Sequence, residues 1–206
     1  MRILNLLAPL LIASSFLSAP LQAETFKDVF PSYTEWLDET LSPRFGTLEL
    51  HRGPQALPNG IVSLNLPPDY YALLGADAQW VMQYLWGNLP DPDLAALTFQ
   101  TGTTPLDGSW GASVYWVDQG HISDIEADMM DFDAILNSYK DNDVEFNRQR
   151  TAQGMATLTT LGLSGVQGYD KLSHALRFSL LLRQEAYDQD VLNANVWVLA
   201  GHGYEI

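Results

Sequence analysis

The sequence contains no cysteine, which excludes disulfide cross-links and thiol catalysis. A domain without disulfides must be held together by its hydrophobic core. Basic residues are also scarce, with 10 lysines and arginines against 25 acids, and none occurs between Arg52 and Lys140. The net charge of -15 repels phosphate backbones, so no nucleic-acid partner is expected. The acidity either keeps the protein soluble or attracts cations or a basic partner.

Long apolar runs are missing except at the N-terminus. There, Met1-Arg2 precedes a mostly apolar stretch that ends in small residues up to Ala23. This pattern predicts a secretory signal peptide over residues 1–23, because a retained membrane helix needs roughly 20 apolar residues. We expect residues 24–206 to form a single domain in the periplasm or cell envelope, with no transmembrane segment in the mature chain.

The spacing of apolar residues switches between a helical period and strict alternation along the mature chain. A broken amphipathic helix is predicted over residues 24–41, interrupted at Pro31, and an uninterrupted helix over residues 75–85. Strands are predicted over residues 47–51 and 61–66, joined through Pro58-Asn59-Gly60, and as a pair over residues 94–99 and 110–117.

The second half of the sequence begins with a helix-capping pattern. Ser123 and Glu126 have the spacing of a capping box, so a helix is expected to start at Ser123, with Asp131 as the alternative cap of a separate helix. Its predicted inner face comprises Ile125, Met129, Phe132, Ile135, Leu136 and Tyr139. A further helix is expected over residues 143–154, ending at Gly154, followed by strands over residues 155–163, 172–182 and 191–199. The predicted fold class is α+β: mainly antiparallel sheet covered on one side by helices.

Several separated motifs resemble a known family. They are Leu66-Pro67-Pro68-Asp69-Tyr70-Tyr71, Trp86-Gly87-Asn88-Leu89-Pro90, the stretch 110–128 that includes Gly120-His121-Ile122-Ser123-Asp124, Asp131-Phe132-Asp133 and Asn147-Arg148-Gln149-Arg150. From about residue 60 to residue 206 the chain resembles the bacterial membrane-anchored proteins of domain-of-unknown-function family 2167. The resemblance implies no reaction, because the role of that family is itself unassigned.

The chain also departs from the family pattern. The Gly-Trp-Ala and Pro-x-Tyr-Asp motifs of the family correspond here to Gly162-Leu163-Ser164 and Gln167-Gly168-Tyr169-Asp170, and the arginines of a late strand motif are replaced at Trp197 and His202. The family usually continues into an apolar C-terminal helix that is missing here. We therefore expect a divergent or C-terminally short member, to which the membrane anchor cannot be transferred.

The candidate binding residues lie in three places. Trp86, Gly87 and Asn88 either cap a helix or line a ligand pocket, and a second group contains Asp118, Gly120, His121, Asp124 and Asp128. We expect Trp86-Gly87-Asn88 and the loop from Asp118 to Ser123 to lie side by side on one rim of the sheet. Asn147 and Arg150 share a helix face and are expected to bind a carboxylate such as Asp118 or Asp170.

No complete catalytic site is present in the sequence. Gly162-Leu163-Ser164-Gly165-Val166 lacks the final glycine of a serine-hydrolase elbow, and the four histidines form no close zinc-binding pair. The favoured hypothesis is a non-enzymatic binding or accessory module that acts on an envelope protein or small ligand, with no cofactor and no metal. The alternative is an envelope hydrolase or divalent-metal protein that uses His121, Asp124 and Asp128.

Overall fold

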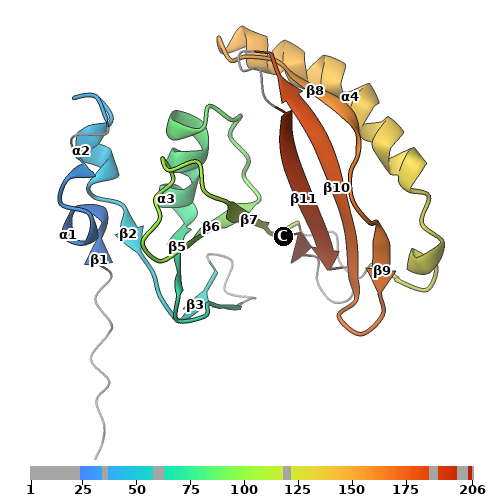
Figure 1. Ribbon diagram of the computed structural model, residues 1–206, viewed down its shortest axis with the longest axis horizontal. Helices are drawn as coiled ribbons and strands as arrows, with labels where there is room; N and C mark the ends of the chain where they lie inside the picture. The colour runs from blue at the N-terminus through green and yellow to red at the C-terminus, as the bar shows by residue number, and fades with distance from the viewer. Residues whose placement is uncertain are drawn as a thin grey trace, which may run out of the picture.

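The computed structural model describes residues 24–33, 37–57, 63–117, 122–185 and 190–198, and the backbone of residues 204–205. The predicted signal peptide lies outside this part of the chain. The α+β class is confirmed, because helices combine with an eight-stranded antiparallel sheet of order β5-β6-β7-β12-β11-β10-β8, in which β9 also pairs with β10 (Figure 1). Two smaller sheets pair β1 (Glu24–Thr25) with β2 (Glu49–Leu50), and β3 (Pro54–Ala56) with β4 (Ser63–Asn65).

The first half of the main sheet consists of β5 (Tyr70–Leu74), β6 (Leu94–Gln100) and β7 (Gly111–Tyr115). The helix α3 (Gly75–Trp80) continues into a π-helical turn (Val81–Leu85) and packs on β5 and β6. The hydrophobic core of this first half includes Phe26, Phe45, Tyr71, Leu73, Val81, Leu97 and Phe99. The helix predicted over residues 75–85 and the strand pair that follows it are therefore confirmed.

The second half contains β8 (Leu158–Leu163), β9 (Gly168–Asp170), β10 (Ala175–Gln184) and β11 (Asp190–Val198). The 21-residue helix α4 (Phe132–Ala152) runs along this half beside β8 and β10 (Figure 1). It ends as predicted, since Gly154 has a φ of 73°, and Met155 N–H donates to Arg150 O at 2.9 Å. The three late strands predicted from the sequence are confirmed.

The short strand β12 (Tyr204–Glu205) joins the two halves of the sheet. Glu205 pairs with Tyr115 of β7 on one side and with Trp197 of β11 on the other. Residues directly opposite each other in neighbouring strands point to the same face, so Tyr115 and Trp197 share a face. Tyr115 packs on the core beneath α3 and Trp197 on the core beneath α4, which places both helices on one side of the sheet.

The predicted helix over residues 24–41 is wrong in extent. Within the described part of residues 24–41 the only α-helix is α1 (Phe26–Val29), because the chain turns at Pro31; the next α-helix, α2 (Ser42–Phe45), begins after the predicted range. The predicted strands 47–51 and 61–66 exist in shortened form, but they do not pair with each other. β2 pairs with β1, and β4 pairs with β3.

The helix predicted to start at Ser123 is also wrong. Only a 3₁₀ turn (Ala127–Met129) forms there, and α4 begins after Asp131, whose carboxylate accepts the Ala134 N–H at 3.0 Å. The buried residue of the turn is Ala127, so Ile125 and Met129, predicted to face inward, are exposed. In the described residues no helix is long and apolar enough to cross a membrane.

Candidate functional site

Trp86-Gly87-Asn88 closes the helical segment that starts with α3. Gly87 has a φ of 62°, which favours glycine, and Asn88 N–H donates to Met82 O at 3.0 Å. The Trp86 ring packs edge-on against Phe99, and its indole N–H donates to the Pro105 carbonyl at 2.9 Å. These contacts fit the capping interpretation of the motif, in which the tryptophan anchors a helix end to the core.

A polar network lies where the 3₁₀ turn meets β9 and the start of β10. Asp124 Oδ2 is 2.7 Å from His174 Nδ1 and also accepts a hydrogen bond from the Tyr169 hydroxyl. The hydroxyl is 3.4 Å from the same histidine nitrogen. The turn carries Asp124 to this place because Ala127 packs with Leu176 in the core below.

Electrostatics in this network favour a carboxylate beside a neutral phenol. The hydrogen bonds from Tyr169 and His174 hold the pKa of Asp124 below its usual value. Loss of solvent contact, followed by the hydrogen bond to Asp124, raises the pKa of Tyr169 to about 12. Asp124 therefore stays ionised at neutral pH, and the proton of the phenol is retained as a hydrogen-bond donor.

His174 is held in an unusual backbone conformation. Its φ of 50° is the only positive value of a non-glycine residue in the described part of the chain. Such conformations are uncommon outside glycine and cluster at functional positions. The hydrogen bonds of His174 in this part of the chain involve Nδ1, which leaves Nε2 without a partner there, and about half of the side chain is exposed.

The network is bordered by a second ion pair and by exposed apolar side chains. Lys171 Nζ lies 2.6 Å from Asp128, whose pKa is lowered by this contact. Exposed fractions reach 84% for Ile125, 73% for Met129 and 96% for Leu172. We call this surface the Asp124 rim; it comprises Asp124, Ile125, Asp128, Met129, Tyr169, Lys171, Leu172 and His174. It combines ordered polar groups with apolar side chains in water.

Asn147 and Arg150 have a different environment, between α4 and the outer edge of β8. Asn147 accepts the Leu158 N–H at 2.8 Å and donates to the Leu158 carbonyl at 2.6 Å. Arg150 donates from Nε to the Ala156 carbonyl at 2.6 Å and is 1% exposed. The predicted pairing with Asp170 is wrong, because Asp170 binds Ser173 and Arg177 instead; Asp118 lies outside the described residues.

Asp143 continues this row one turn earlier on α4. Its carboxylate accepts the N–H of Thr160 at 2.7 Å and the hydroxyl of the same residue at 2.9 Å. Asp143 and Asn147 therefore bind alternate residues of the β8 edge, and Arg150 binds Ala156 just before this strand; we call these three side chains the edge clamp. The spacing of four and three residues aligns the three side chains on one helix face. They satisfy backbone groups that an edge strand leaves free.

The structure brings only some of the predicted site residues together. Asp124 and Asp128 share the Asp124 rim, whereas Trp86 packs in the separate core beneath α3. Asp118, Gly120 and His121 fall outside the described residues, so the predicted contact between Trp86 and residues 118–121 is not described. Within the residues that are described, no three His, Asp or Glu side chains group together as a metal site.

Sequence reasoning missed the partners of Asp124. His174 lies 50 residues away and Tyr169 lies 45 away, so neither local spacing nor helix periodicity connects them to Asp124. The pattern Gln167-Gly168-Tyr169-Asp170 did contain one of them. It corresponds to a Tyr-Asp motif of the resembling family and could have identified Tyr169.

The chemistry available at the rim is hydrogen bonding and proton exchange. An aspartate bound to Nδ1 fixes the tautomer of an imidazole and leaves Nε2 for a second partner.

Residues 49–206 match the family described as protein of unknown function (DUF2167). The chain belongs to this family. Its matched region includes β2 and every later element, hence the Asp124 rim and the edge clamp. Comparison with curated proteins and with solved structures finds no match.

Proposed function

We propose that this member of the DUF2167 family is an exported binding or accessory module of the cell envelope, without a catalytic role, and that it binds an envelope protein through the Asp124 rim. The observation that carries the proposal is the near-complete exposure of Leu172 and Ile125 beside an ordered polar network. Exposed apolar side chains grouped within a polar border are typical of protein interaction sites.

Rigidity of the rim supports this role. Tyr169 and Trp197 pack around Leu176 below the rim, and Asp124 connects the 3₁₀ turn to His174 at the start of β10. Binding costs less free energy when the contacting side chains are already held in place. Leu172, at the turn between β9 and β10, would then insert into a partner without ordering the loop first.

The proposal can be tested by site-specific photo-cross-linking in the cell of origin. A photoreactive residue at position 172 should give a discrete cross-linked product. The same residue at position 144 should not, since Val144 is 79% exposed on α4 away from the rim. Identical products from the two positions would contradict the proposal. Export is tested separately by sequencing the N-terminus of the mature protein, which should begin at Glu24.

A second candidate is an envelope hydrolase or divalent-metal protein, favoured by the contact of Asp124 with His174 Nδ1. Titration with calcium, magnesium and zinc, followed by melting, separates it from a protein-binding role. A metal present at a hundredfold excess over its Kd stabilises the folded state by about 2.7 kcal/mol. Unchanged melting with all three ions would remove the metal candidate and leave the cross-linking prediction intact.

A further inference from the structure

The edges of the main sheet are covered to different extents. The edge clamp covers β8, and His51 covers β5 by exchanging backbone hydrogen bonds of 2.8 and 2.9 Å with Ala72. β11 pairs with β10 along its whole length, but with β12 only at Trp197 and Val198. In the described part of the chain, residues 190–196 therefore pair on one side only.

The direction of the free backbone groups follows from the hydrogen bonds of β10. Ser164 N–H donates to Ser179 O at 2.9 Å. The backbone N–H and C=O groups of the odd-numbered β10 residues therefore point toward β8. The backbone groups of Leu180 consequently point toward β11, where they pair with those of Asn193. By alternation, the N–H and C=O groups of Leu192, Ala194 and Val196 point away from β10, and no described residue bonds to them.

Among the described residues, this edge lacks the usual protection against strand pairing. Residues 190–194 are all exposed, with Val191 at 50% and Leu192 at 59%. The segment contains no lysine or proline, and the register shift of this half of the sheet lies between β8 and β10. Native proteins normally block exposed edges by such devices. Within the part of the chain that the structure describes, the β11 edge therefore contrasts with the clamped β8 edge.

We propose that residues 190–196 of β11 bind an extended peptide segment of a partner protein, which adds as an antiparallel strand in line with β12. The segment carries net positive charge and apolar side chains at alternate positions. Strand addition uses backbone hydrogen bonds for affinity and alternate side chains for specificity. This surface is distinct from the Asp124 rim, and the proposal does not depend on the function of that rim.

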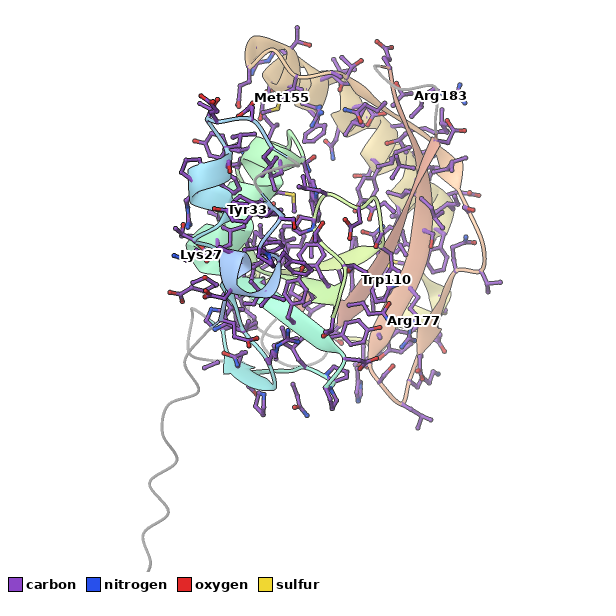
Figure 2. All side chains as sticks on the ribbon, turned by 60° about the vertical axis from the view of Figure 1, so that its left-hand side comes forward. Lys27, Tyr33, Trp110, Met155, Arg177 and Arg183 are labelled. Atoms are coloured by element: carbon purple, nitrogen blue, oxygen red, sulfur yellow. The ribbon has the colours of Figure 1, made fainter. Side chains whose placement is uncertain are left out.

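Two observations determine the occupant. First, β12 already pairs antiparallel with Trp197 and Val198 of β11. A peptide that runs in the same direction as β12 would therefore extend this ladder along the rest of β11. Second, the net charge of -15 attracts a basic peptide, and Arg183, which would repel it, is paired with Asp190 at 2.8 Å. Figure 2 shows Arg183 and Arg177 at opposite ends of β10. Val191 and Leu192 present apolar contacts on opposite faces of the strand.

Hydrogen exchange of the full chain tests the proposal directly. The probe is a synthetic peptide of about eight alternating valines and lysines, long enough to span the open edge. It should slow exchange of the Leu192, Ala194 and Val196 amides by roughly tenfold or more, because these N–H groups gain partners. A peptide of the same length with proline at alternate positions is the control and should have no effect.

Two variants locate the binding edge. Ala194→Pro removes an outward N–H without breaking the β10 ladder, so folding should persist while peptide protection disappears. Leu192→Lys keeps every backbone group but adds a like charge, and should weaken binding of the basic peptide even if the proline variant fails to fold. No protection by the peptide, or undiminished protection in the Leu192→Lys protein, would overturn the proposal. Protection that rises with protein concentration alone would instead make a second copy the occupant.

Discussion

The edge clamp and the Asp124 rim each contain two polar residues that the sequence marked as candidates, yet the two pairs differ in what they bind. Asn147 binds backbone groups of Leu158 in β8, and the buried Arg150 binds the carbonyl of Ala156 just before this strand. Asp124 and Asp128 bind side chains at a hydrated surface. Burial and the nature of the partner therefore separate the structural role of the clamp from the binding role that we propose for the rim, whereas residue type does not.

The energetic consequences of the two arrangements are opposite. Removing a clamp residue leaves buried backbone groups without partners, which costs about 1–3 kcal/mol for each group. Removing a rim residue exposes its partner to water that can replace it, so the cost is about 0–1 kcal/mol. Unfolding measurements on matched variants can therefore confirm or abolish the distinction.

The largest effect is expected at Arg150. Burial lowers the pKa of this guanidinium, and the remaining Nη1 group has no hydrogen-bond partner in the described part of the chain. Arg150→Ala should lower the free energy of unfolding by about 3 kcal/mol, because it removes buried packing and the bond to Ala156. Arg150→Met should cost about half as much, since it keeps the packed stem and removes a desolvated charge. Urea unfolding measures the free energy of unfolding of both variants. Equal losses in the two would show that the guanidinium and its hydrogen bond, rather than packing of the side-chain stem, account for the contribution of Arg150.

The next effect concerns Asn147. Asn147→Ala should lower the free energy of unfolding by about 2 kcal/mol, because both the N–H and the C=O of Leu158 lose their partner. Asn142→Ala, on an exposed position of the same helix, is the matched control and should change it by about 0.5 kcal/mol or less. Similar losses for the two variants would mean that α4 does not protect the β8 edge through this side chain.

The main elements of the fold could be predicted because their patterns are local. Seven consecutive residues of β6 suit a buried strand, and Gly154 marks the end of a helix by its own backbone preference. The start of α4 was misplaced because Ser123 and Asp131 both resemble caps. Packing of Ala127 against Leu176 decided between them, and that contact joins segments distant in the sequence.

The candidate site was only partly predictable for the same reason. Asp124 was found from its neighbours, but its interaction with His174 depends on β9 and β10 meeting the 3₁₀ turn. Asn147 was correctly placed on a helix face, yet its backbone partner at Leu158 could not be read from spacing. Single-sequence patterns reveal which side chains share an element, whereas the partner of each side chain is determined by tertiary packing.

A smaller effect is expected at the rim under acid. Because the pKa of Asp124 is below its usual 3.8 in the folded state, the unfolded state binds the proton more tightly. The stabilisation is therefore complete above that value and is lost as pH falls through the lower folded pKa. The difference in unfolding free energy between wild type and Asp124→Asn should shrink from pH 5 to pH 2. Over this range the unfolded state takes up the Asp124 proton before the folded state does. Asp141→Asn is the control on α4, and a difference that is constant with pH would remove the linkage.

The smallest effect on stability is expected at His174. Its φ of 50° costs a non-glycine residue about 1 kcal/mol, and its exposed bond to Asp124 returns a similar amount at most. His174→Gly relieves the backbone and loses the bond, so the free energy of unfolding should stay within about 0.5 kcal/mol of wild type. His174→Val, which is β-branched, should lose about 2 kcal/mol at the same position.

The same glycine variant separates binding from stability at the rim. If His174 is retained for recognition, cross-linking from position 172 should fall in the folded His174→Gly protein, while cross-linking from position 144 stays at background. The imidazole then contributes to partner binding rather than to folding, in keeping with its half-exposed side chain and unfavourable backbone conformation. A loss of several kcal/mol in His174→Gly would instead make the rim a stabilising element like the edge clamp, and the distinction between the two regions would disappear.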